Sequence, residues 1–210
     1  MPEKINIVGT GGLAKELIAY IVDETEARYE INGAWSDLKF NSPAYEHFYR
    51  GTIDDLIAEQ SDYPCLLAIA EPKGKKIVVS RFPDTTKWLT YIHPSANVSS
   101  FSSVGKGCVI APLGIVTGDA SLGDFVFFNT SAVIGHDSTI GTFSTLYPNT
   151  EVCGNCHIGE SCTFGIGSYT VPDVTLPDGC SIGAGSIVWK SPEQSGLLIG
   201  NPAEMVKVYQ

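Results

Sequence analysis

Apolar residues recur at every sixth position over the second half of the chain. Fifteen of sixteen consecutive positions in this series are apolar, and the exception is Thr170. The series consists of Val98, Val104, Ile110, Val116, Leu122, Phe128, Ile134, Ile140, Leu146, Val152, Ile158, Phe164, Thr170, Leu176, Ile182 and Val188. An α-helical period would drift out of phase within two steps, so the pattern predicts a parallel β-helix of hexapeptide repeats, with roughly five coils of three short strands.

A second series, two residues before the first, contains mainly small side chains. Its members are Ala96, Ser102, Cys108, Gly114, Ala120, Val126, Ala132, Ser138, Ser144, Thr150, Cys156, Cys162, Ser168, Val174, Cys180 and Ser186. We expect the large aliphatic residues to fill the interior of each coil and the small ones to fit where the chain turns. Because three six-residue sides make one coil, residues eighteen apart should form columns at the strand spacing of about 4.8 Å.

The first part of the chain has a different pattern. An apolar strand, a glycine turn and a helix with Leu13, Leu17, Ile18 and Ile21 on one face are indicated by "INIVGTGGLAKELIAYIVDE". Further strands are indicated by "EINGAWSD" and "CLLAIA", and a further helix by "TIDDLIAEQ". The pattern predicts a small Rossmann-like α/β domain with parallel strands over residues 1–92, followed by the β-helix over residues 93–210.

Composition limits the partners that the protein can have. The net charge is −10 with only 13 Lys and Arg residues, so we expect no nucleic-acid partner and no anionic membrane surface. The N-terminus has no signal-peptide pattern, and no apolar run could span a bilayer. We therefore expect a cytoplasmic protein that binds a small molecule and keeps its six cysteines reduced.

The stretch "EVCGNCHIGE" contains Cys153, Cys156 and His157 in the C-x-x-C-H spacing of c-type haem attachment. Cys156 belongs to the series of small residues, and the stretch lies within an unbroken repeat. No second C-x-x-C pair completes a zinc site. We therefore interpret Cys156 as a packing residue and expect neither haem nor metal.

Gly9, Gly11 and Ala14 form a G-x-G-x-x-A pattern between the first strand and the first helix. Backbone amides at such a helix N-terminus favour a phosphate, and Asp37 is placed to accept a hydrogen bond from a ribose or a base. A domain of about ninety residues is small for NAD. A nucleotide of another kind is the preferred interpretation, and a purely structural turn is the alternative.

These features together resemble the bacterial sugar acetyltransferases of the NeuD and PglD group. The resemblance rests on the N-terminal domain, the hexapeptides, "NTSAVIGHDSTIG", "GIGSYTVPDVTLPDG" and "IGNPAEMVK". It implies a left-handed β-helix, acetyl-CoA as cosubstrate and a homotrimer with active sites between subunits. The PglD type, which is the most similar, acetylates the 4-amino group of a UDP-linked 4-amino-4,6-dideoxy sugar.

The resemblance also implies roles for single residues. His136 matches the general base, and Asp137 matches the acidic residue that orients its imidazole. A neutral imidazole suits this task near neutral pH. Gly154 matches the glycine whose amide contacts the thioester oxygen. Independently of the family, Gly154 lies eighteen residues after His136 and should be its neighbour in the next coil.

Ligand contacts are implied at further positions, with some departures from the family. UDP would contact Thr10, Gly11 and Asp37, the sugar would contact Asn129 and Thr130, and acetyl-CoA would contact Thr145, Gly154, Gly165, Ala184 and Gly185. Thr145 replaces a second histidine of the PglD type, Gly135 replaces an acidic residue, and Ser36 replaces an aspartate. These departures affect substrate recognition.

The sequence therefore predicts an acetyl-CoA-dependent N-acetyltransferase of a UDP-linked 4-amino sugar that transfers the acetyl group directly. The alternative on the same fold is an O-acetyltransferase of sialic acid or another sugar. A zinc-binding scaffold like the γ-carbonic anhydrases needs several histidines per site, and the coils hold only His136 and His157. The interpretation as an NAD-dependent oxidoreductase is supported by the glycine turn alone.

Overall fold

The chain folds into two compact units, Met1–Thr90 and Tyr91–Gln210, in a computed structural model that describes residues 1–209. The second unit begins two residues earlier than the sequence suggests. Tyr91 and Ile92 form its first strand and pair with Val109 and Ile110 of the next coil. The repeat therefore extends to residues that the hexapeptide series did not include.

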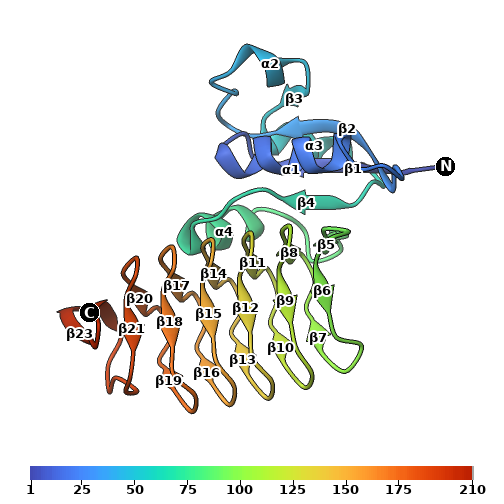
Figure 1. The fold of residues 1–210 in the computed structure, drawn as a ribbon. Coiled ribbons are helices and arrows are strands. Elements are labelled where there is room, and N and C mark those ends of the chain that lie inside the picture. The colour runs from blue at the N-terminus through green and yellow to red at the C-terminus, as the bar shows by residue number, and fades with distance from the viewer. Residues whose placement is uncertain (210) are drawn as a thin grey trace. The chain divides into compact units, whose positions relative to one another are not determined.

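The N-terminal unit contains one four-stranded parallel sheet with the strand order β3-β2-β1-β4 (Figure 1). Its elements are β1 (Glu3–Val8), α1 (Gly12–Val22), β2 (Tyr29–Trp35), α2 (Pro43–Glu46), β3 (Tyr49–Gly51), α3 (Ile53–Glu59), β4 (Cys65–Leu67) and α4 (Pro72–Val79). The predicted strand–turn–helix unit is confirmed as β1 and α1, and the further strands and helix as β2, β4 and α3. The elements α2, β3 and α4 were not predicted.

Apolar burial and local capping explain these elements. Helix α1 buries Leu13, Leu17, Ile18 and Ile21, the four residues of the predicted apolar face. Helix α3 begins at a capping box, in which the Thr52 hydroxyl accepts from the backbone of Asp55 and the Asp55 carboxylate accepts from the backbone of Thr52. The sheet and its helices thus form a core of their own within this unit.

The second unit is a parallel β-helix whose strands are two residues long in nearly every turn. Five complete coils are followed by a partial one, within the residues that the structure describes. The strands are β5 (Tyr91–Ile92), β6 (Asn97–Val98), β7 (Ser103–Val104), β8 (Val109–Ile110), β9 (Ile115–Val116), β10 (Ser121–Leu122), β11 (Phe127–Phe128), β12 (Val133–Ile134), β13 (Thr139–Ile140), β14 (Thr145–Leu146), β15 (Glu151–Val152), β16 (His157–Ile158), β17 (Thr163–Phe164), β18 (Tyr169–Thr170), β19 (Thr175–Leu176), β20 (Ser181–Ile182) and β21 (Ile187–Val188).

Residues eighteen apart are paired in the three sheets, as the periodicity predicts. In one sheet Leu122 pairs with Val104 on one side and with Ile140 on the other. The inward members of the apolar series form one continuous core, and Cys108, Cys156, Cys162 and Cys180 of the small series are buried in it. The interpretation of Cys156 as a packing residue is confirmed.

Every hexapeptide from residue 107 to residue 185 contains one residue with a positive φ angle. The fourteen positions are six residues apart, and ten of them are not glycine. They are Gly107, Leu113, Asp119, Phe125, Ser131, Asp137, Phe143, Asn149, Asn155, Ser161, Gly167, Asp173, Gly179 and Gly185. Asp and Asn adopt this left-handed conformation more readily than most side chains, and Asp137 is one of these turn residues.

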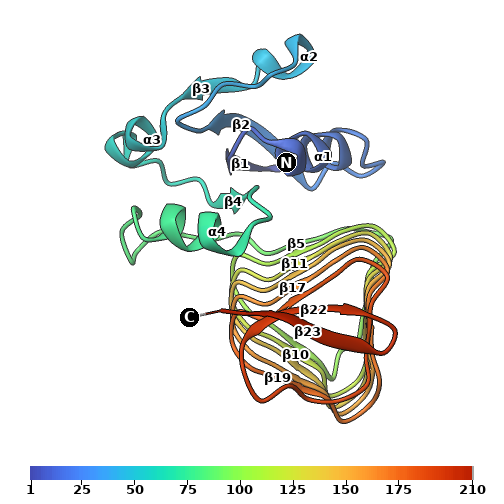
Figure 2. The same ribbon diagram turned by 90° about the vertical axis from the view of Figure 1, so that its left-hand side faces the viewer.

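A hairpin covers the C-terminal end of the coils (Figure 2). Strand β22 (Gly196–Gly200) pairs in parallel with β20, and β23 (Ala203–Val208) returns antiparallel to β22. Leu198 belongs to the buried core, and Ala203 and Met205 pack against it. The hairpin therefore shields the last coil from solvent.

Candidate active site

His136 and Asp137 occupy the turn between β12 and β13, where both side chains are exposed. The Nδ1 atom of His136 lies 2.7 Å from Oδ2 of Asp137. A neutral imidazole with its proton on Nδ1 donates it to this carboxylate and leaves Nε2 with a free lone pair. The turn can therefore present a histidine whose second nitrogen accepts a proton.

Gly154 lies one coil further on, beside the ring of His136. A Cβ atom at this position would lie 2.7 Å from Nε2 and 2.8 Å from Cε1 of His136. Real Cβ atoms do not approach other atoms so closely, so any side chain at this position would displace the imidazole from the place that it occupies. The predicted column of His136 and Gly154 is present.

The backbone amide of Gly154 has no hydrogen-bond acceptor among residues 1–209. Its carbonyl oxygen, in contrast, accepts from the amide of Asp173 at 3.1 Å. The turn thus combines a histidine nitrogen with an unpaired amide donor. This combination of a proton acceptor and a donor for developing negative charge is what acyl transfer requires.

The three residues of the C-x-x-C-H pattern have different surroundings. Cys156 is fully buried, and its Sγ atom lies 3.3 Å from the carbonyl oxygen of Val171. His157 is exposed on the outer face of β16, where Nδ1 lies 3.2 Å from the hydroxyl of Thr139. Cys153 is half-buried, and burial raises the pKa of its thiol. The pattern therefore results from the repeat.

The glycine turn of the N-terminal unit borders a pocket of about 630 Å³. Gly9 is needed for the fold, because its φ is +129° and a Cβ would lie 2.7 Å from the carbonyl oxygen of Ala68. Gly11 is the N-cap residue of α1, offers no side chain to cap the helix and would leave an added Cβ in open space. Thr10 is buried and donates to the carbonyl of Leu38 at 2.7 Å. Thr10 and Gly11 both line the pocket.

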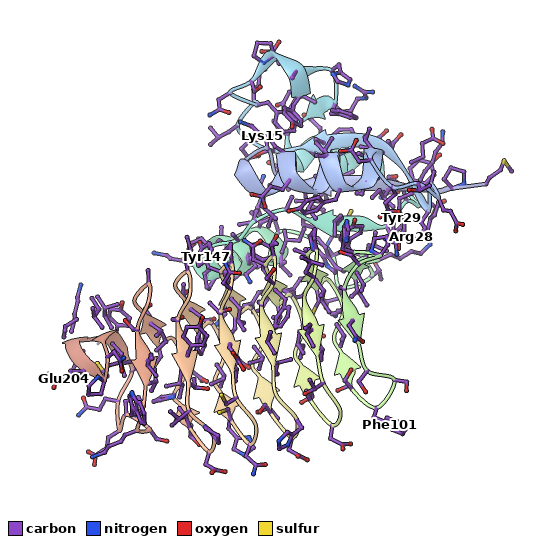
Figure 3. All side chains as sticks on the ribbon, viewed as in Figure 1. Lys15, Arg28, Tyr29, Phe101, Tyr147 and Glu204 are labelled. Carbon is purple, nitrogen blue, oxygen red and sulfur yellow. The ribbon has the colours of Figure 1, made fainter. Side chains whose placement is uncertain are left out.

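Two lysines of this pocket were not predicted from the sequence. Lys15 and Lys39 are among its lining residues, and Lys15 extends from α1 (Figure 3), where its Nζ donates to Oδ1 of Asn41. Lys15 follows Gly11 by four residues, which is one helical turn. This spacing is visible in the sequence and predicts a cation near the N-terminus of the helix.

Asp37 does not line the pocket, although its neighbours Ser36 and Leu38 do. Its carboxylate pairs with Arg81 and also accepts from the backbone of Ile53. The hydrogen bond from Arg81 lowers the pKa of Asp37. The carboxylate of Asp37 therefore points to Arg81. A contact between Asp37 and a nucleotide stays a prediction.

The residues predicted to contact the sugar and CoA lie mainly at a different turn of the coils from His136. Asn129 is nearly buried, and its Oδ1 accepts from the backbone of Thr130 at 2.7 Å. Gly165 has no room for a Cβ, which would lie 2.5 Å from the backbone nitrogen of Ala184, whereas Gly185 faces open space. Within one chain, strand β12 separates Thr130 from His136.

The remaining predicted CoA contact, Thr145, is fully buried. The structure therefore gives no support to a contact between the side chain of Thr145 and a ligand. Among residues 1–209, no group of three His, Cys, Asp or Glu side chains is arranged to hold a metal ion. No helix in the same range has the length and apolar character needed to cross a membrane.

Comparison with known proteins gives similar folds over nearly the whole chain. The acetyltransferase domain of PglB from Neisseria gonorrhoeae is 25% identical, with a TM-score of 0.86 over 97% of this chain and 100% of that one. PerB from Caulobacter crescentus, solved with CoA and GDP-perosamine, is 27% identical, with a TM-score of 0.84 over 96% of both chains. The PglB domain has also been solved with acetyl coenzyme A.

Curated sequences match over shorter stretches. GDP-perosamine N-acetyltransferase from Escherichia coli O157:H7 is 28% identical over 112 residues, which is 53% of this chain and 42% of that protein. Presumed acetyltransferases from Staphylococcus aureus are 40% identical over 57 residues. The chain spans only 29% of their length, and no family model matches it.

These comparisons confirm the predicted left-handed β-helix with a small N-terminal α/β part. They also agree with acetyl-CoA as the cosubstrate, because structures of the relatives contain acetyl-CoA or CoA. The nucleotide in the PerB structure is GDP, so the prediction of a UDP-linked sugar is not confirmed. By fold and by sequence, the chain is similar to the PglB and PerB acetyltransferases of hexapeptide-repeat fold.

Proposed function

We propose that the protein transfers the acetyl group of acetyl-CoA to the amino group of a nucleotide-linked amino sugar. The observation that carries this proposal is the arrangement of His136, with Nδ1 on Asp137 and the ring against Gly154. The unpaired amide of Gly154 supplies the second element that acyl transfer needs.

The reaction can be written with this chain's own groups. The sugar amine attacks the thioester carbon, and Nε2 of His136 takes the proton that the amine loses. The carbonyl oxygen becomes an oxyanion that accepts a hydrogen bond from the Gly154 amide. When the C–S bond breaks, the CoA thiolate leaves and receives the proton from His136. A base of this kind contributes about 10²- to 10⁴-fold, and one oxyanion donor about 10²- to 10³-fold.

The pocket at the glycine turn is the proposed nucleotide site. The free amides at the start of α1 and the cations Lys15 and Lys39 favour a diphosphate. A UDP-linked 4-amino-4,6-dideoxy sugar is the substrate that the resemblance implies. The GDP-perosamine bound to PerB makes a GDP-linked amino sugar the first competitor.

A homotrimer with sites between subunits would complete the active site. The outer face of one sheet supports this part of the proposal, because it holds two pairs of apolar side chains that are not buried. Ile115 pairs with Val133 and Tyr169 pairs with Ile187, and Glu151 lies between the two pairs. A second chain would cover such a face. Sharing of sites would also bring the turn of Thr130 and Gly165 in one subunit to the turn of His136 in another.

The proposal is tested by incubating the protein with acetyl-CoA and separate acceptors. These are UDP-linked 4-amino sugars, GDP-perosamine, CMP-sialic acid and free sialic acid, and mass spectrometry with NMR identifies the product. An N-acetylated nucleotide sugar is expected. An acetyl ester on sialic acid would support the O-acetyltransferase instead. Sedimentation analysis should show a trimer, and a stable monomer would contradict the shared site.

A further inference from the structure

The strand pairing of the β-helix is irregular directly beside Gly154. Strand β12 pairs with β15 through two residue pairs, and so does β18 with β21, whereas β15 pairs with β18 only through Glu151 and Tyr169. The pair that is missing is Val152 with Thr170. The ladder is therefore interrupted at the residue that precedes Cys153 and Gly154.

A side chain replaces the backbone bond at this interruption. At the equivalent turn one coil earlier, the amide of Gly135 donates to the carbonyl of Val152 at 2.7 Å. The amide of Cys153 donates instead to the hydroxyl of Thr170, at 3.1 Å. Thr170 is buried and is the one polar residue of the apolar series. The Thr170 hydroxyl thus accepts a hydrogen bond that the side chain of valine or isoleucine could not accept.

A second buried hydroxyl holds the other side of Cys153. Ser138 is fully buried, donates to the carbonyl of Cys153 at 2.8 Å and accepts from the amide of Cys156 at 2.9 Å. The carbonyl of Cys153 and the amide of Gly154 belong to the same trans peptide and point in opposite directions. Because Ser138 holds the carbonyl inside the coil, the N–H of Gly154 points outward.

The next turn of the coil shows what such an amide binds. Ser144 donates to the carbonyl of Gly159 at 3.0 Å and accepts from the amide of Cys162, in the same way as Ser138. The following amide, that of Glu160, donates to the carboxylate of Asp178 at 2.8 Å. The residue equivalent to Asp178 beside Gly154 is Pro172, which has no carboxylate. The Gly154 amide is therefore left open for a negatively charged oxygen from a ligand.

We propose that Ser138 and Thr170 are positioning residues, which clamp the backbone of Cys153 so that the Gly154 amide points at the oxyanion of the reaction. This proposal rests on the proposed acetyl transfer and adds two buried hydroxyls to it. Neither side chain touches the reacting atoms. Both contact the backbone of Cys153, whose carbonyl belongs to the peptide group that joins it to Gly154, and the Ser138 hydroxyl also lies 3.2 Å from the carbonyl oxygen of His136.

The kinetic test compares Ser138→Ala and Thr170→Val with a matched control, Ser144→Ala. The control removes the same type of buried hydroxyl from a turn that does not adjoin His136. If the Gly154 amide no longer points at the oxyanion, kcat should fall about tenfold in both test variants, with little change in the KM for the sugar. Ser144→Ala should keep kcat within roughly twofold of the wild type.

Conservative variants separate positioning from stability. Ser138→Cys should recover most of kcat, because Cys108 and Cys162 use thiols to reach the carbonyls of Gly123 and Pro177 in equivalent positions. Thr170→Ser keeps the hydroxyl and should also recover activity. Equal kcat values in Ser138→Ala and Ser144→Ala, at equal thermal stability, would overturn the proposal.

A second measurement does not depend on turnover. In protein labelled with ¹⁵N-glycine, the amide signal of Gly154 should shift in Ser138→Ala and Thr170→Val and remain in place in Ser144→Ala. An unchanged signal in the test variants would refute the clamp. If the wild type acetylates no acceptor, the proposed function fails, and this spectrum still decides whether the two hydroxyls orient the amide.

Discussion

The imidazole of His136 lies in the space that a Cβ atom on residue 154 would fill, with Nε2 2.7 Å from that position. The absence of a side chain at Gly154 therefore determines where the proposed base can lie. The same residue contributes the unpaired amide beside it. One glycine thus supports both parts of the proposed chemistry, and substitutions at and around it give the sharpest tests.

Gly154→Ala should lower kcat by about a hundredfold or more, because the His136 ring must move and a small displacement of a catalytic group is costly. Steady-state kinetics measure this effect. Gly118→Ala is the matched control, since Gly118 lies one coil before His136 in the same column and an added Cβ there would approach only the Ser99 hydroxyl, at 3.9 Å. Equal activity of the two variants would show that the contact between His136 and residue 154 has no catalytic importance.

Asp137→Asn should lower kcat at least about tenfold, because the carboxylate that holds Nδ1 of His136 loses its charge. Asn tolerates the left-handed backbone of this position, so thermal stability should change little. Asp119→Asn provides the control, because Asp119 has a φ of 59° at the same turn position one coil earlier. A loss of activity in both variants would indicate a general effect on the coil.

Cys153 should react with iodoacetamide before the other cysteines. It is half-buried, whereas Cys65 and Cys162 are buried and burial raises the pKa of each to about 12. Burial raises the pKa of Cys153 as well, so its reaction should be slow at neutral pH and accelerate as the pH rises. Mass spectrometry of digested protein identifies the labelled residue. Labelling of Cys156 before Cys153 would contradict the burial of Cys156 in the coil.

The pair of Asp37 and Arg81 should stabilise the N-terminal unit in a pH-dependent way. Arg81 lowers the pKa of Asp37 in the folded state, so the contribution is complete above the unfolded pKa of about 3.9 and is lost as the pH falls through the lower folded value. Because both groups are partly exposed, Arg81→Gln should cost below about 1 kcal/mol at pH 7. Thermal unfolding at pH 7 and near pH 2 tests this, since the difference between variant and wild type should shrink in acid.

The periodicity was sufficient to predict the β-helix and its columns, because each side of a coil is a two-residue strand followed by a four-residue turn, which places every sixth residue inside the coil. It also explained Cys156, whose spacing with Cys153 and His157 resembles a haem motif. The beginning of the repeat was less visible, since the strand of Tyr91 and Ile92 precedes the regular hexapeptides.

Long-range polar contacts could not be derived from the sequence. From the sequence, Asp37 is available to a nucleotide. Only the fold shows that its carboxylate forms a salt bridge with Arg81, which lies forty-four residues later. Thr170 appeared to be an irregularity of the apolar series. The role of Thr170 depends on the amide of Cys153, which precedes it by seventeen residues and lies next to it in the coil.

The central claim is that His136 accepts the proton of the amine during acetyl transfer. Its most direct test is the rate of CoA release from acetyl-CoA in the presence of a nucleotide-linked amino sugar, with wild type and His136→Ala compared side by side. The variant should retain its trimeric state and its thermal stability and lose about 10²- to 10⁴-fold in kcat. A variant that releases CoA at the wild-type rate would contradict the proposed mechanism.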